Sequence, residues 1–215
     1  MISRRRLVVA SPLLLLPSAA WATAIPPSKT LSFRITCKGA EIGSHTLSFS
    51  GDPGSDFTAR AEVQVAVRVL GVRLFHYTHH MVETWSGGRF VSLDATTDDD
   101  GDKAFATVRR SSDGLSVDGS SGKYTAPGNT LPATHWNIAE MKSPMLNPEN
   151  GRMIHATIGG PSSDTVPTVS GKSIAATHYT WRGDDTLDLY YAADGTWAGL
   201  TALAKDGSKL VYTRV

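Results

Sequence analysis

The sequence predicts an all-β fold: an antiparallel meander that forms a strongly curved sheet or β-barrel, with one short helix or irregular plug segment. Hydrophobic and polar residues alternate from Phe57 to Trp85, which is typical of strands with one buried face. Turn-forming glycine and aspartate clusters recur at short spacing along the chain. The spaces between the expected strands leave no room for helical crossovers, which excludes parallel βαβ units.

The stretch from Phe57 to Trp85 predicts a long hairpin that reverses at Leu70-Gly71. If that turn is even-numbered, Val65 faces His76 and Ala61 faces His80. We therefore expect His76, Thr78 and His80 on the apolar, concave face, and Tyr77 and His79 on the outer face. Strands of roughly 13 residues would run about 40 Å, and such long ribbons curl.

Further strands are expected on both sides of a break that is rich in proline, between Tyr124 and Gly151. The expected strands are 31–37, 44–50, 90–97, 103–110 and 115–117 before the break, and 152–158, 173–181, 186–191, 197–203 and 209–214 after it. Asn137 and Glu140 resemble a capping box, so the one short helix is expected there. This segment is too apolar to be fully exposed to solvent, so we expect it to lie across one opening of the sheet.

The N-terminus has the features of an export signal over residues 1–22, with the mature protein forming a single β-barrel-like domain over 23–215. Ser3-Arg4-Arg5-Arg6 is basic, Leu7 to Leu16 is largely apolar, and Ala20-Trp21-Ala22 matches a cleavage site. The arginines fit a twin-arginine signal as well as a general secretory one. Either route predicts a periplasmic or secreted protein. No later stretch is long enough to span a membrane, so we expect no transmembrane segment in the mature chain.

Composition limits the partners. The chain has 215 residues, 40% of them hydrophobic, and a net charge of +1, with neither sign gathered into long blocks. The sequence therefore lacks the clustered basic residues of a nucleic-acid-binding protein, and we expect no nucleic-acid partner. Cys37 is the only cysteine, so no intramolecular disulfide can form, and a buried strand position is expected for it.

Six residues form the candidate ligand-binding set: His76, Thr78, His80, Trp85, His135 and Trp136. On one strand His76 and His80 would lie about 13 Å apart, too far to share a metal ion unaided. They are either histidines at the edge of the core or residues that contact a ligand. His135 and Trp136 lie in the break, where they either line the rim of a pocket or anchor the plug. No metal site or cofactor is predicted, and the acidic loop from Asp98 to Asp102 is interpreted as a solvated turn.

Several short motifs resemble a family of exported proteins of unknown function from Gram-negative bacteria. They are Gly-x-x-Ile-Gly at Gly39, Glu-x-Trp-x-x-Gly-Arg at Glu83, Thr-Thr-Asp-Asp-x-Gly at Thr96, His-Trp-Asn at His135 and Tyr-Tyr-x-x-Asp-Gly at Tyr190. The resemblance covers most of the mature chain and implies no activity for any residue. More remotely, a curved sheet with a plug is similar to lipocalin-like and lipoprotein-carrier folds, but fold analogy does not assign a function.

Three functions are compatible with these observations. The leading hypothesis is a non-catalytic periplasmic protein that binds a lipid or another hydrophobic small molecule inside the curved sheet. The second is a metal-dependent enzyme that uses His76, His80 and His135. The third is a structural component of an envelope assembly. The sequence lacks the common hydrolase, zinc-protease, phosphate-loop and Cys-x-x-Cys motifs, which favours the first hypothesis.

Overall fold

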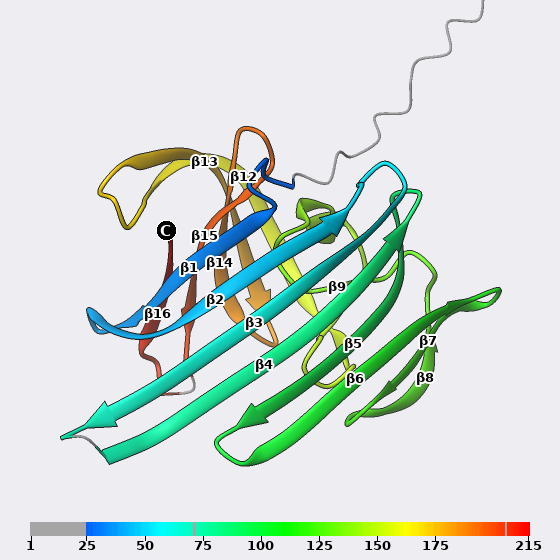
Figure 1. The fold of residues 1–215 in the computed structure, drawn as a ribbon, viewed down its shortest axis with the longest axis horizontal. Helices are drawn as coiled ribbons and strands as arrows, with labels where there is room; N and C mark the ends of the chain where they lie inside the picture. The colour runs from blue at the N-terminus through cyan, green and yellow to red at the C-terminus, as the bar shows by residue number, and fades with distance from the viewer. Residues whose placement is uncertain (1–24, 71, 205) are drawn as a thin grey trace, which may run out of the picture.

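The fold is one large antiparallel sheet that curls around a small irregular subdomain (Figure 1). The computed structural model describes residues 25–70, 72–204 and 206–215. Its elements are β1 (Thr30–Cys37), β2 (Ala40–Gly51), β3 (Asp56–Val69), β4 (Val72–Ser86), β5 (Arg89–Asp99), β6 (Asp102–Ser111), β7 (Gly114–Gly119), β8 (Gly122–Ala126), β9 (Leu131–Pro132), η1 (Ile138–Lys142), β10 (Met145–Leu146), β11 (Met153–Ile154), β12 (Ala156–Pro167), β13 (Ser173–Gly183), β14 (Thr186–Ala192), β15 (Trp197–Leu203) and β16 (Lys209–Arg214).

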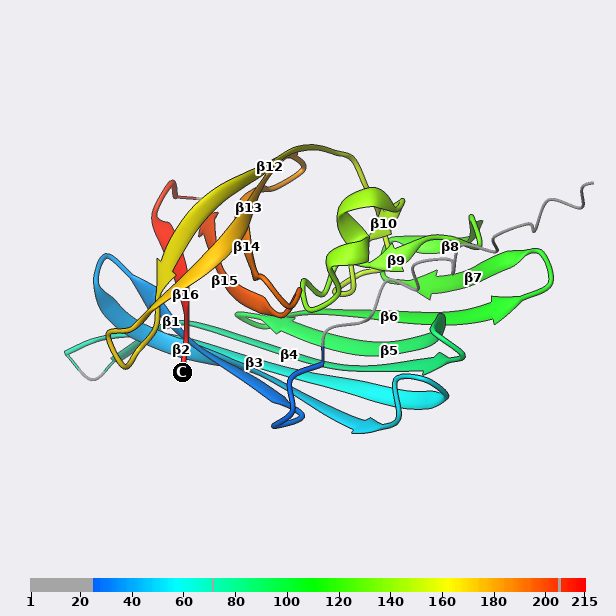
Figure 2. The ribbon, with the colours of Figure 1, turned by 90° about the horizontal axis from the view of Figure 1, so that it is seen from above.

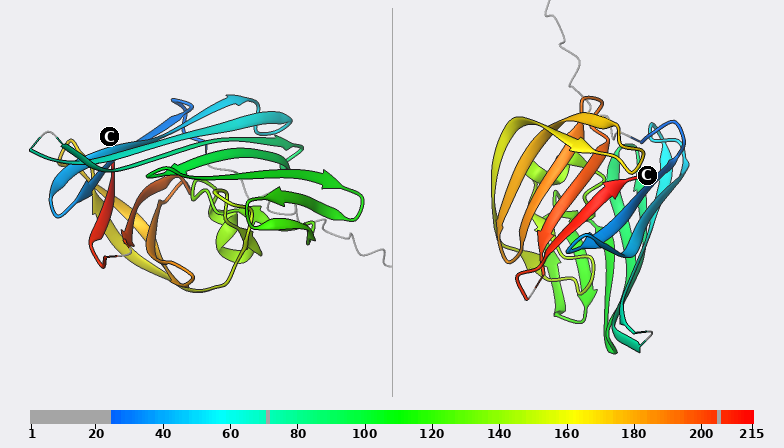
Figure 3. Two further views of the ribbon diagram at one scale, coloured as in Figure 1. Left: turned by 90° about the horizontal axis from the view of Figure 1, so that it is seen from below. Right: turned by 90° about the vertical axis from the view of Figure 1, so that its left-hand side faces the viewer.

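Two meanders are joined into a single 13-stranded sheet by the antiparallel pairing of β1 with β16. The strand order is β12-β13-β14-β15-β16-β1-β2-β3-β4-β5-β6-β7-β8. The outermost strands, β12 and β8, do not pair with each other, so the sheet is curved but not closed, as the two views in Figure 3 show. The predicted fold class is confirmed. No helix among the described residues has the length and apolar character to cross a bilayer.

The β3–β4 hairpin contains a β-bulge that reverses the predicted faces of β4. Val69 pairs with Val72 and Arg68 with Arg73, but Val67 then pairs with Phe75, which leaves Leu74 as an unpaired extra residue. From Phe75 onward, alternate residues of β4 therefore point to the opposite side from the one predicted.

The prediction that His76 and His80 face the apolar side is wrong for this reason. His79 is 5% exposed and pairs with Val63, whereas His80 is exposed. His76 and Thr78 lie on the same outer face as His80, and Tyr77 lies on the inner face with His79. Because side chains alternate with a period of two, one extra residue moves every later side chain to the other face.

The segment between β8 and β12 packs against the concave face of the sheet (Figure 2). It contains η1 and a three-stranded sheet in the order β11-β10-β9. Asn137 is the N-cap of η1, and its side chain accepts a hydrogen bond from the Ala139 backbone N–H, which confirms the predicted position of the one short helix. This segment, residues 127–155, is called the plug below.

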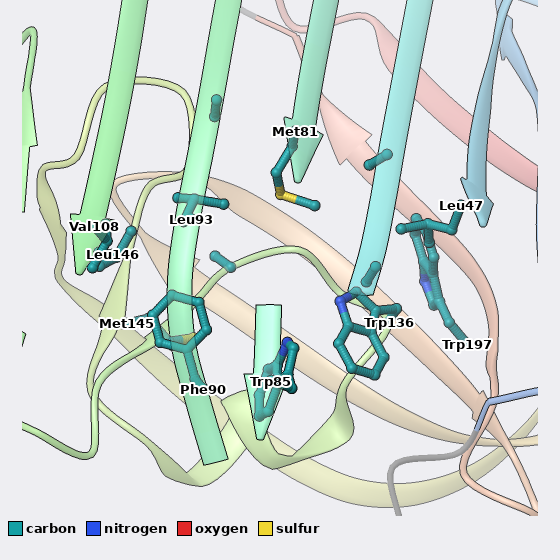
Figure 4. Packing of buried hydrophobic residues seen from close by; sticks show 14 of the residues in the cluster. Leu47, Met81, Trp85, Phe90, Leu93, Val108, Trp136, Met145, Leu146 and Trp197 are labelled. Carbon is teal, nitrogen blue, oxygen red and sulfur yellow. The ribbon is translucent and has the colours of Figure 1, made fainter. Parts of the chain in front are cut away.

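Trp136 is fully buried in the core, so of its two predicted roles the plug anchor is confirmed and the place at a pocket rim is wrong (Figure 4). Its ring makes edge contacts with Phe49, Phe57 and Trp85 at centroid distances of 5.2, 5.8 and 5.5 Å. Met145 and Leu146 of the plug are also buried in this cluster. Cys37 lies at the end of β1 and is half-buried rather than buried.

We expect Trp136→Ala to lower the free energy of unfolding by about 3–5 kcal/mol, because it leaves a large cavity among three aromatic rings. Urea unfolding followed by circular dichroism measures the change. Phe105→Ala, at a position that is 44% exposed, is the control and should cost less than about 1 kcal/mol. Equal stability of Trp136→Ala and the parent would show that the plug does not anchor the sheet.

Deletion of Leu74 should be tolerated, because it removes only the bulged residue and leaves Val67 opposite Phe75. Leu74 is 59% exposed, so little apolar burial is lost. We expect a change in unfolding free energy of about 1 kcal/mol or less. Deletion of His80 instead would exchange the inner and outer side chains in the half of β4 that precedes it. We expect this variant not to fold to soluble protein. Similar behaviour of the two deletions would contradict the bulge.

Candidate binding site on the inner face of the sheet

The inner face of the sheet divides into a filled half and an open half. In the filled half the plug and its aromatic cluster occupy the space under β2–β8. In the open half, toward the tip of the β3–β4 hairpin, inner side chains remain half-buried. These are Val65, Val67, Phe75, Tyr77 and, across the curve of the sheet, Tyr212. Apolar side chains on a concave surface that stay partly in contact with water are typical of a ligand site.

His45 lies at the boundary between the two halves and is 8% exposed. Its ring contacts Trp197 at 5.2 Å and Tyr212 at 6.0 Å between centroids. Its Nε2 is buried without a hydrogen-bond partner among the described residues. Burial, with smaller effects from His135 and His79, lowers the pKa of His45 to about 3, so the imidazole is neutral at pH 7. An unsatisfied buried nitrogen costs free energy, and such groups in native proteins call for an explanation.

His79 lies on β4, on the same inner face. Its Nδ1 is 2.9 Å from the Thr97 hydroxyl, on the neighbouring strand β5. Burial lowers the pKa of His79 to about 4, with a smaller effect from His80. The inner face therefore presents two neutral imidazoles and no histidine cation at this level of the sheet.

Tyr77 and Tyr212 meet the plug residue Glu149 in the open half. The Tyr77 hydroxyl donates a short hydrogen bond to Glu149 Oε1. Burial and the Glu149 carboxylate together raise the pKa of Tyr77 above its ordinary range, and raise the pKa of Tyr212 to about 12. Both phenols therefore stay protonated at neutral pH. Glu149 thus ties the plug to the sheet in the open half.

Two buried carboxylates hold the plug in the filled half. Glu83 of β4 accepts hydrogen bonds from the indole N–H groups of Trp85 at 2.8 Å and Trp136 at 3.2 Å. Glu140 of η1 accepts from the backbone N–H of Thr134 at 3.1 Å, from the Tyr191 hydroxyl at 3.2 Å and from His135. Both carboxylates are fully buried, and their bonds are directed at plug or sheet residues rather than at a space for substrate.

Glu140 positions both the backbone and the ring of His135. Its backbone N–H bonds Oε2 at 3.1 Å and its Nδ1 lies 3.0 Å from Oε1. These bonds hold a non-glycine residue at a φ of 66°, in the left-handed region. The ring lies between Trp181 and Trp197, with centroid distances of 5.9 and 5.8 Å. His135 is therefore a packing and hydrogen-bonding residue of the plug.

The six predicted site residues do not form one site. His76, Thr78 and His80 lie on the outer face, Trp85 and Trp136 lie in the core, and His135 lies in the plug. His76 is paired with Asp98 at 3.4 Å and Asp100 at 3.2 Å. The described residues contain no group of three or more His, Cys, Asp or Glu side chains that could hold a metal ion. The geometry therefore does not bring together the three histidines that the metal-enzyme hypothesis needs.

Sequence reasoning missed His45, His79, Tyr77 and Glu149. One signal for the β4 residues was present: Phe75, Tyr77, His79, Met81 and Trp85 alternate as a set that is more apolar than the set containing Thr78 and Thr84. The predicted phase instead follows from an even-numbered turn at Leu70-Gly71, which lies on the other side of the bulge from these residues. Glu149 lies in a loop after Pro148, and no local pattern connects it to Tyr77, 72 residues earlier.

The outer face carries two shallow depressions, of about 490 and 470 Å³. The first crosses β3–β6 and is lined by side chains of both charges, including Arg60, Glu62, His80 and Asp94, beside the exposed ring of Phe105. Both depressions are open and are framed by strand surfaces rather than by converging loops. They have fewer features of a ligand site than the inner face has.

One serine, histidine and aspartate also line up on the outer face of β12–β14. Ser162 Oγ is 3.4 Å from His178 Nδ1, and His178 Nε2 is 3.2 Å from Asp188. Asp188 is also bonded by Arg182 at 2.9 Å, which neutralises the carboxylate that would orient a catalytic histidine. The contact from serine to histidine is long, and we interpret the group as a surface hydrogen-bond network.

The buried Glu83 should make stability depend on pH. Burial raises its pKa from 4.5 to about 7, so the folded state keeps a proton that the unfolded state releases near 4.5. The contribution of Glu83 to stability is therefore greatest below about pH 4.5 and is lost as pH rises through 7, by at most about 3 kcal/mol. Glu83→Gln should remove that part of the slope, which urea unfolding at pH 5, 6, 7 and 8 measures. Parallel pH profiles for the parent and Glu83→Gln would refute the assignment.

A protein of known structure has a similar fold. A crystal structure of a beta-barrel-like protein of the domain of unknown function DUF1849 from Brucella abortus superposes with a TM-score of 0.61 at 10% sequence identity, covering 86% of this chain and 94% of that one. At this identity the likeness shows the fold alone. No curated protein matches the sequence. Residues 33–215 match the domain of unknown function DUF6134 along almost the whole described chain, and the protein therefore belongs to the DUF6134 family.

Proposed function

We propose that this protein is an exported, non-catalytic binding protein that holds a lipid or another hydrophobic small molecule against the inner face of its open half. The observation that carries the proposal is the half-buried apolar surface formed by Val65, Val67, Phe75 and Tyr77, with Tyr212 across the curve of the sheet. A ligand that covers this surface gains roughly 25 cal/mol for each Å² of apolar area removed from water. The export signal at residues 1–22, which precede the described part of the chain, supports a periplasmic or secreted location.

The polar groups at the inner end of this surface favour a particular kind of head group. His45 and His79 are neutral, and His45 Nε2 is free to donate or accept, depending on its tautomer. A buried anion would find no cationic histidine there, and burial of an unpaired charge is costly. The site is therefore suited to a hydrophobic molecule with an uncharged hydrogen-bonding group, such as a hydroxyl, ester or amide.

A second function has one supporting observation. The strands β12 and β8 are free sheet edges, and an exposed edge offers backbone groups to a partner strand in an envelope assembly. The two functions are separated by one measurement on protein purified from its own compartment. Native mass spectrometry should detect a bound small molecule if the first is correct, and a protein that is consistently empty favours the second.

Ligand binding can be tested with the fluorescent probe N-phenylnaphthylamine. Val65→Glu places a charge on the apolar inner surface and should weaken probe binding by roughly ten-fold or more. Gln64→Glu is the matched control, because Gln64 is the adjacent residue of β3 and points outward. It should leave the affinity unchanged. Equal affinities for both variants, at equal melting temperature, would overturn the proposed site.

A further inference from the structure

The β3–β4 hairpin extends beyond the sheet as a free two-stranded arm. The pairing of β3 with β2 ends at Val65, and the pairing of β4 with β5 ends at Tyr77. Between Ala66 and Phe75, the described residues of the two strands pair with each other and with no other strand. Figures 1 and 3 show this end of the hairpin projecting past the neighbouring turns. We refer to residues 66–75 as the arm.

The end of the arm is strongly apolar. Leu70 is 99% exposed, more than any other large hydrophobic residue described, and Leu74 is 59% exposed. Single exposed leucines are common on protein surfaces. Leu70 lies at the turn, and Leu74 lies on the other side of the Arg68–Arg73 pair, so exposed apolar side chains stand on both sides of this pair near the end of the arm.

The charged residues of the arm itself are both arginines. Arg68 is exposed on the arm, and the sequence contains Arg73 but no carboxylate between Glu62 and Glu83. The nearest acidic turn, at Asp98 and Asp100, lies back at the level of His76 and is bonded to it. An apolar tip flanked by arginine matches the boundary of a bilayer with anionic head groups, where leucine reaches the acyl chains and arginine remains near the phosphates.

We propose that the arm docks this protein onto an anionic lipid surface, with Leu70 below the head groups, Arg68 against the phosphates and Leu74 at the level of the head groups. The inference goes beyond the proposed function and does not depend on it. A second copy of the chain fits the tip less well, because a specific protein interface needs about 800 Å² from each partner and a tip with two exposed leucines cannot supply that area. The free edges of the arm keep their backbone groups outside the hydrocarbon, so only the tip enters it.

Flotation with vesicles tests the proposal. The parent protein should float with vesicles of phosphatidylethanolamine and phosphatidylglycerol. Leu70→Ser with Leu74→Ser should lower the partition coefficient by about ten-fold or more, and Arg68→Glu by about five-fold. Phe105→Ser, which changes an exposed ring on the outer face, is the matched control and should leave it unchanged. No flotation of the parent, or equal flotation of the parent and the double variant, would overturn the proposal.

A second measurement reports the location of the tip. Leu70→Cys, in a Cys37→Ser background, can carry an environment-sensitive fluorophore. We expect a blue shift when anionic vesicles are added, and none for the same label at position 105. Dimerisation that the double variant abolishes, without vesicle binding by the parent, would overturn docking in favour of self-association. The double variant should keep its affinity for N-phenylnaphthylamine, whereas Val65→Glu should keep vesicle binding, so failure of one proposal can be distinguished from failure of the other.

Discussion

The structure depends on how an open, curved sheet buries its concave face. A closed barrel fills its interior with side chains from its own strands, but here β12 and β8 do not meet, and the face between them must be covered by something else. The plug does this by inserting Trp136 among Phe49, Phe57 and Trp85. The polar atoms brought in with it are satisfied by Glu83 and Glu140. Without these two carboxylates, the indole N–H groups of Trp85 and Trp136 and the backbone N–H groups of Thr134 and His135 would lack acceptors.

This arrangement explains why two fully buried carboxylates are tolerated. Each accepts several hydrogen bonds, and burial of Glu83 raises its pKa towards 7 instead of leaving a fixed charge in the core. The same bonds orient His135, whose φ of 66° would be unfavourable without them. The His-Trp-Asn segment, which has the features of a site in the sequence, thus serves to attach the plug, with Asn137 capping η1.

The fold class could be predicted because alternation and turn chemistry are local. The strands, the turns and the one short helix follow from residues a few positions apart. The faces of β4 could not be predicted, because a single unpaired residue at Leu74 changes the phase of the strand while leaving its composition unchanged. The contact of Tyr77 with Glu149 depends on the curvature of the whole sheet, so no sequence pattern contains it.

The distant similarity to the DUF1849 protein helps to separate residues that the fold requires from residues that it does not. Two chains with 10% identity share this curved sheet, so the fold rests on periodic apolar positions rather than on particular side chains. Val63, Leu47 and Met81 satisfy that periodicity on the inner face. His45 occupies an equivalent inner position, where a valine or leucine would pack without an unsatisfied nitrogen. Its unpaired Nε2 is therefore a departure from the pattern that the fold requires, and such departures are expected at functional or strained positions.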